Sequence, residues 1–125
     1  MATLLIVTAL VEAMTGLALL IAPSLVVSLL LGATIETSSG IAVAHVAGAA
    51  LLSIGAACWL ARNDRRSSAA RGLVLALLFY NAIVAVVLVH AHFVLGLSGI
   101  VLWPVVAAHA ALAGWCVVAT SKREA

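Results

Sequence analysis

Residues 3–22, TLLIVTALVEAMTGLALLIA, decide the fold class of this chain. The stretch has one charged residue, Glu12, and is otherwise almost wholly apolar. An α-helix of about twenty apolar residues is what the ~30 Å hydrocarbon layer of a bilayer requires. No Lys or Arg precedes the stretch, and it is too long for the apolar core of a cleaved signal peptide. We therefore predict a retained membrane helix over residues 4–22.

The rest of the chain has the same character. Of its 125 residues, 66% are hydrophobic and 8% are charged, and the mean hydropathy is +1.34. Soluble domains average about a quarter charged residues. Further continuous apolar runs occupy residues 41–61, 72–92 and 100–120. The sequence thus predicts an all-α integral membrane protein, a four-helix transmembrane bundle forming a single domain. Because Pro23 interrupts the first run, residues 24–31 are expected to be a kinked extension or a short interfacial helix.

The cations predict the topology. All six lie either between the second and third apolar runs or in the C-terminal tail: Arg62, Arg65, Arg66, Arg71, Lys122 and Arg123. Four crossings place these two regions on one side, and the positive-inside rule makes that side the cytoplasm. We therefore expect a multi-pass protein of the bacterial inner (cytoplasmic) membrane, with both termini inside. Its main partner is then the lipid bilayer, and nucleic acid is not expected.

Each predicted helix has one polar side chain near mid-membrane. At ~1.5 Å per residue, these side chains lie roughly 12 to 16 Å from the cytoplasmic end of their helices. They are Glu12, Ser53, Asn81 and His109, with Thr8, Thr15 and Tyr80 in supporting positions. A carboxylate at this depth costs a few kcal/mol unless it faces polar partners, so we predict that the four form one layer. Glu12 is then either ionised against a protonated His109, or both are neutral and hydrogen-bonded.

The layer has two interpretations, which the sequence leaves open. Polar side chains in a bundle stabilise and align its helices by hydrogen bonds worth about 0.6 kcal/mol each. The same groups could instead bind a ligand or a proton, since ionisable residues within membranes often do.

Three further histidines lie near the opposite surface: His45, His90 and His92. Imidazoles at similar depth bind Zn or Cu, but His90 and His92 are two residues apart and point in different directions on a helix. Haem would need two axial ligands at one depth, whereas His45 and His109 are offset by about 8 Å. We accordingly expect no metal site and no cofactor, with haem as the alternative.

Small residues and cysteines indicate how the helices pack. Faces of small residues let helix backbones approach closely, within the chain, in a homo-oligomer or in a larger membrane complex. Such faces are Gly48 with Gly55 in the second run, and Ala107 with Ala111 and Ala110 with Gly114 in the fourth. Cys58 and Cys116 are expected to be buried thiols, because the cytoplasmic side is reducing.

Two resemblances bear on function. The stretch LVEAMTG, residues 10–16, resembles the region around the lone Glu of small multidrug resistance transporters, which would imply that Glu12 couples proton binding to substrate exchange. The aromatic-rich third helix of that family is missing. The stretches TGLALLIAP and LWPVVAAHAALAGW, with the Arg-rich loop, resemble uncharacterised four-helix bacterial inner-membrane proteins, including DoxX-like ones.

No phosphate-binding loop, Ser/His/Asp set or pair of carboxylates within the membrane is present, so we do not expect an enzyme. The leading hypothesis is an accessory or interaction subunit whose polar layer fixes helix packing or binds a small ligand. The alternatives are a small proton-coupled transporter that uses Glu12, and a haem- or quinone-binding membrane anchor that uses His109 or His45.

Overall fold

The computed structural model describes residues 1–64 and 67–121, and within them the chain is helical apart from short connections. Its helices are α1 (Ala2–Ile21), α2 (Pro23–Leu31), α3 (Ser38–Ala61), α4 (Ser68–Phe93) and α5 (Leu102–Ser121). All except α2 are long and apolar enough to cross a membrane. The all-α prediction is confirmed, and the four long helices indicate a multi-pass membrane protein.

Two helices begin earlier than the apolar runs, because polar residues cap them. Thr37 accepts a hydrogen bond from the Gly40 backbone N–H and starts α3 at Ser38. Ser67 accepts one from the Ala70 N–H and starts α4 at Ser68. Such caps satisfy backbone donors that have no partner within the helix. These two helices therefore begin about one turn before the residues that hydrophobicity marks.

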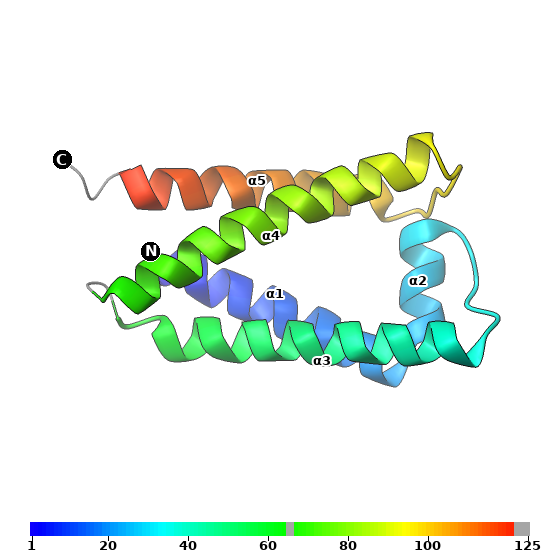
Figure 1. Cartoon of the computed structure of the whole chain (residues 1–125), viewed down its shortest axis with the longest axis horizontal. Coiled ribbons are helices and arrows are strands. Elements are labelled where there is room, and N and C mark those ends of the chain that lie inside the picture. Colours follow the sequence, from blue (N-terminus) through cyan, green and yellow to red (C-terminus); the bar gives the residue numbers. More distant parts are fainter. Residues whose placement is uncertain (65–66, 122–125) are drawn as a thin grey trace.

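The segment after Pro23 is a separate helix, α2, that lies across the ends of the long helices (Figure 1). Pro23 occupies its first turn, where a missing N–H costs little, and Ala22 breaks from helical geometry at φ −139° and ψ 61°. Gly32 ends the helix in the left-handed conformation, φ 70°. The segment is thus a separate short helix and not a bent continuation of α1.

The long helices form two pairs, α1 with α3 and α4 with α5, and α2 stands between the pairs at one end (Figure 1). The N-terminus, the loop between α3 and α4, and the end of α5 lie together at the opposite end. There an apolar core joins both pairs. It includes Leu4 and Leu5 of α1, Val74 of α4, and the free thiols Cys58 and Cys116, which are fully buried as expected.

Glycines allow α1 and α3 to pack in close contact. A Cβ atom on Gly16 would lie 2.6 Å from the Gly48 carbonyl oxygen, and one on Gly48 would lie 2.8 Å from the Gly16 carbonyl oxygen. A Cβ on Gly55 would lie 3.0 Å from the Ala9 carbonyl oxygen. The Gly48–Gly55 face thus packs within the chain. By contrast, Gly114 of α5 has no neighbour within 4 Å of such an atom.

Backbone hydrogen bonds fix the position of α2. The last carbonyls of a helix have no partner within it. Here Gly99 N–H donates to the Leu30 carbonyl at 3.2 Å, and Val101 N–H donates to the Leu29 carbonyl at 3.1 Å. The contact tolerates no side chain at Gly99, since a Cβ there would lie 2.1 Å from the Leu29 oxygen. The segment just before α5 therefore holds the end of α2.

These contacts predict that Gly16→Ala destabilises the protein, by about 1–3 kcal/mol as for other overpacked sites. The matched control is Gly114→Ala, for which we expect little change, because the added methyl meets open space. Unfolding in mixed detergent micelles measures both. An equal loss in the two variants would contradict the Gly16–Gly48 contact.

Candidate functional site

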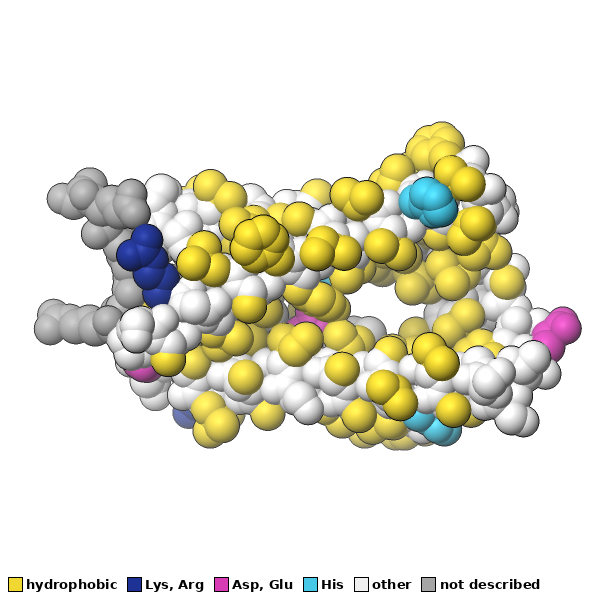
Figure 2. All heavy atoms as spheres, viewed as in Figure 1, with side chains coloured by type: hydrophobic (Ala, Val, Ile, Leu, Met, Phe, Trp, Pro, Cys, Tyr) yellow, Lys and Arg dark blue, Asp and Glu magenta, His cyan; other side chains and the backbone are white. Residues whose placement is uncertain are grey.

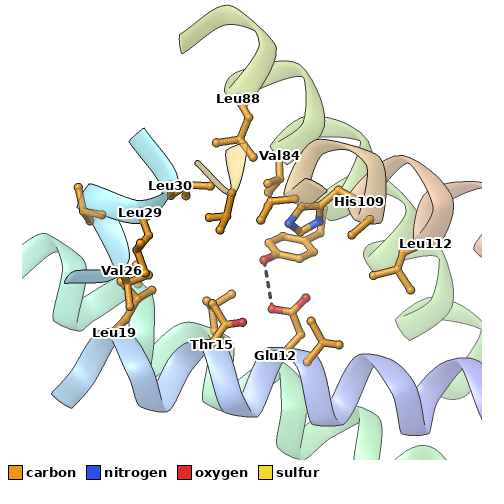
Figure 3. Close-up of a pocket in the computed structure, with 18 residues that line it drawn as sticks. Glu12, Thr15, Leu19, Val26, Leu29, Leu30, Val84, Leu88, His109 and Leu112 are labelled. Atoms are coloured by element: carbon orange, nitrogen blue, oxygen red, sulfur yellow. Dashed lines mark hydrogen bonds between the residues drawn. The ribbon is translucent and has the colours of Figure 1, made fainter. Parts of the chain in front are cut away.

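A cavity of about 480 Å³ lies between the two helix pairs, on the side nearer α2. All five helices contribute to its wall, and all but four of the lining residues are aliphatic. Leu19 of α1 and Val26, Leu29 and Leu30 of α2 line the end nearer α2 (Figure 3). The four polar residues are Glu12, Thr15, Tyr80 and His109. The cavity is thus an apolar space with a polar region in its wall.

Glu12 and Tyr80 link the two helix pairs beside this cavity. The Tyr80 hydroxyl on α4 donates to Glu12 Oε2 on α1 at 3.2 Å (Figure 3). Among the described helical residues, this is the one side-chain hydrogen bond between the α1–α3 pair and the α4–α5 pair. Glu12 is only 2% exposed, and its Oε1 is buried without a hydrogen-bond partner. One turn earlier, the buried Thr8 hydroxyl is also without a partner.

Asn81 positions His109 within the α4–α5 pair. Asn81 is fully buried, and its Nδ2 donates to the Leu77 carbonyl at 2.8 Å. Its Oδ1 therefore faces His109 Nδ1, 2.8 Å away. An amide oxygen only accepts hydrogen bonds, so Nδ1 must carry a hydrogen. In the neutral imidazole, Nε2 is then an acceptor, and no described residue donates to it.

The residues of the predicted layer are only partly together. Glu12, Asn81 and His109 lie near one another through Tyr80, whose ring packs edge-on against the His109 ring at 5.7 Å between centroids. The hydrogen-bond partner of Glu12 is Tyr80, rather than His109. Thr15 lines the cavity and projects from the Glu12 side of α1 (Figure 3).

Ser53 does not join the layer, although it lies at the predicted depth. Its side chain is exposed on α3, and its hydroxyl donates to the Ala49 carbonyl one turn back, at 2.9 Å. That local bond satisfies the hydroxyl, so Ser53 can face outward at little cost. The prediction that Ser53 lies beside Glu12 was wrong. Position in the sequence gives the height of a residue along its helix, but it does not show which way the side chain points around the helix axis.

The outer histidines do not form one cluster. His92 contacts the rings of Phe93 and Trp103, at 4.8 and 5.1 Å between centroids, and its Nδ1 lies 3.2 Å from the Leu97 carbonyl. His90 is exposed, and His45 is on α3. Within residues 1–64 and 67–121, no three His, Cys, Asp or Glu side chains are grouped to hold a metal ion. His109 lines the cavity and His45 does not, so these two histidines do not face one space.

Comparison with known proteins adds no relative: no protein-family model matches the sequence, and no curated protein or solved structure matches it significantly.

The sequence anticipated only part of this site. The sequence identified Glu12, Asn81 and His109 from their depth. It underrated Tyr80, which directly contacts both Glu12 and His109. The sequence did not predict that α2 forms part of the aliphatic wall, because a hydrophobic pattern does not indicate the direction in which a short helix runs. No described Lys or Arg lines the cavity, and Arg62 stacks on Trp59 near the end of the bundle where α1 begins.

We predict that Glu12 and Tyr80 are energetically coupled. In a double-mutant cycle of Glu12→Met and Tyr80→Phe, the coupling should be about 0.6 kcal/mol and at most about 1.7, the range for hydrogen bonds within membranes. Reversible unfolding in mixed micelles measures it. Strictly additive effects of the two substitutions would show that the 3.2 Å contact has no energetic weight.

Proposed function

We propose that this protein is a non-catalytic membrane protein that binds a small, largely apolar molecule in the cavity between its helix pairs. The observation that supports this proposal is the cavity itself: about 480 Å³, with an aliphatic wall and a small polar region at Glu12, Tyr80 and His109. Small-molecule sites typically have volumes of about 300–1,000 Å³, with mostly apolar linings and a few polar groups that orient the ligand.

The route into the cavity also favours an apolar ligand. The molecule is hollowed between α3 and α4, on the side nearer α2 (Figure 2). Large apolar side chains are exposed on both of these helices, including Val43 and Val46 on α3 and Val86 and Val87 on α4. A surface of this kind faces acyl chains in a membrane. A molecule dissolved in the bilayer can then enter sideways, without crossing water.

The alternative functions have less support. A transporter needs a path toward both aqueous sides, whereas the apolar core fills the bundle near the termini and α2 crosses its other end. A haem anchor needs two facing imidazoles, and His45 does not line the cavity. The hydrogen bonds of the polar region also align α1 with α4 and α4 with α5, so packing and binding use the same residues.

The proposed setting is the cytoplasmic membrane, with both termini inside. Arg62 and Arg71 lie at the two sides of the connection between α3 and α4, at the end of the bundle where α1 begins and α5 ends. Arg65, Arg66, Lys122 and Arg123, which complete the cation set, lie outside the described residues. Cations in short loops favour the cytoplasmic side. The segments 32–37 and 94–101 would then face outward.

The binding proposal predicts that filling the cavity blocks ligand binding. Ala108 lines the cavity, whereas the neighbouring Ala110 on α5 is exposed and does not line it. The added isopropyl group in Ala108→Leu displaces ligand atoms whose burial is worth about 0.8 kcal/mol per methylene. Affinity for the neutral probe N-phenyl-1-naphthylamine, measured by fluorescence, should fall about tenfold or more. Ala110→Leu should bind as the unmodified protein does, and equal binding by both variants would refute the proposal.

The orientation predicts the labelling of two introduced cysteines. Thr34 and Asn63 are exposed at opposite ends of the bundle, while Cys58 and Cys116 are fully buried and should stay unreactive. A membrane-impermeant maleimide added to intact cells should modify Thr34→Cys and leave Asn63→Cys unmodified until the cells are lysed. The reverse pattern would place the termini outside.

A further inference from the structure

The polar groups that a ligand can reach in the cavity are mainly uncharged. Thr15 is exposed, and Tyr80 and His109 are half-buried, so each presents surface to the space that it lines. Glu12 also lines the cavity but is only 2% exposed. Its Oε1 is fully occluded, and its Oε2 accepts the Tyr80 hydroxyl. The carboxyl therefore contributes to the wall without presenting an open face.

His109 and Thr15 offer complementary hydrogen-bonding groups. The bond to Asn81 requires the hydrogen of the neutral imidazole to be on Nδ1, which makes Nε2 an acceptor without a protein donor. The Thr15 hydroxyl has no hydrogen bond to the described residues, so it is free to donate. His109 and Thr15 project toward the same space from α5 and α1 (Figure 3). A ligand group that both donates and accepts fits this arrangement.

Charged head groups fit the site less well. An anionic head group would be placed beside Glu12 with no cation among the lining residues, in a medium where charges interact strongly. A cationic head group would need an open carboxylate, but Glu12 has almost no exposed surface. Burying a charge without a partner is far more costly than burying a hydroxyl that forms hydrogen bonds.

We propose, on the basis of the proposed function, that the ligand is a neutral aliphatic alcohol whose hydroxyl donates to His109 Nε2 and accepts from Thr15. Its chain extends along the aliphatic wall toward α2. Between Tyr80 and Leu88, both lining residues, α4 rises roughly 12 Å. A saturated chain of about ten carbons has about the same length, at roughly 1.2 Å per bond.

The test compares three probes that differ only in the head group: decan-1-ol, decylamine and decanoate. Each is titrated into the full-length protein in detergent micelles, and native mass spectrometry measures the bound fraction. We expect decan-1-ol to bind more tightly than decylamine and decanoate. Tighter or equal binding of the amine or the acid would overturn the proposed head group.

Variants of His109 and Thr15 test the two proposed hydrogen bonds to the ligand hydroxyl. His109→Asn keeps an N–H that can reach Asn81 but removes the Nε2 acceptor, so decan-1-ol affinity should fall about fivefold, the equivalent of one neutral hydrogen bond. His109→Gln places an acceptor near the Nε2 position and should restore much of the affinity. Thr15→Val, which keeps the shape of the side chain, should also weaken binding about fivefold.

The outcomes distinguish this inference from the function on which it rests. Loss of binding of all three probes in Ala108→Leu, with no effect of His109→Asn or Thr15→Val, would keep the cavity as the binding site and overturn the hydroxyl assignment. Unchanged binding in Ala108→Leu would refute the cavity itself. Thr15→Val removes no hydrogen bond among the described residues, so its thermal unfolding should match that of the unmodified protein and its loss of binding reports the ligand contact.

Discussion

Glu12 and Tyr80 meet across the space between two helix pairs that otherwise join mainly through the apolar core near the termini. A carboxyl at this depth in a bilayer is costly unless it is neutral or has partners, so α4 must present a donor at the height of Glu12. Tyr80 meets that requirement, and its ring also contacts His109, which Asn81 orients. The hydrogen bond between Glu12 and Tyr80 thus joins α1 to α4 at this height, and it lies beside the polar part of the cavity.

At its other end the cavity is bounded by α2, which backbone hydrogen bonds hold in place. The last carbonyls of a helix have no partner within that helix. At the end of α2, the N–H groups of Gly99 and Val101 supply partners, and Gly99 permits the approach because it has no side chain. Because α2 lies between the two helix pairs at this end, it keeps the pairs apart. The cavity occupies the space between them, and α2 forms part of its wall.

The long helices could be predicted from the sequence because bilayer thickness sets the length and apolarity of a membrane helix. Glu12, Asn81 and His109 could be predicted because the fixed rise per residue gives the height of each side chain along its helix. Sequence reasoning failed where rotation about the helix axis mattered, as for Ser53, whose helix is apolar on every side and so shows no inner face. The direction of α2 was also beyond it. A cavity depends on which side chains fail to meet, and that is a property of the assembled helices.

The cavity does not run the full length of the bundle. Leu4, Leu5 and Val74 fill the end where α1 begins, whereas the space from Glu12 to α2 is open to the side. On the proposed function, ligands of this cavity would enter it from a single leaflet of the membrane. Molecules inserted in that leaflet are within reach, and chemically identical molecules in the other must first flip across. Its occupancy would therefore report the transverse asymmetry of the membrane as well as the total amount of ligand.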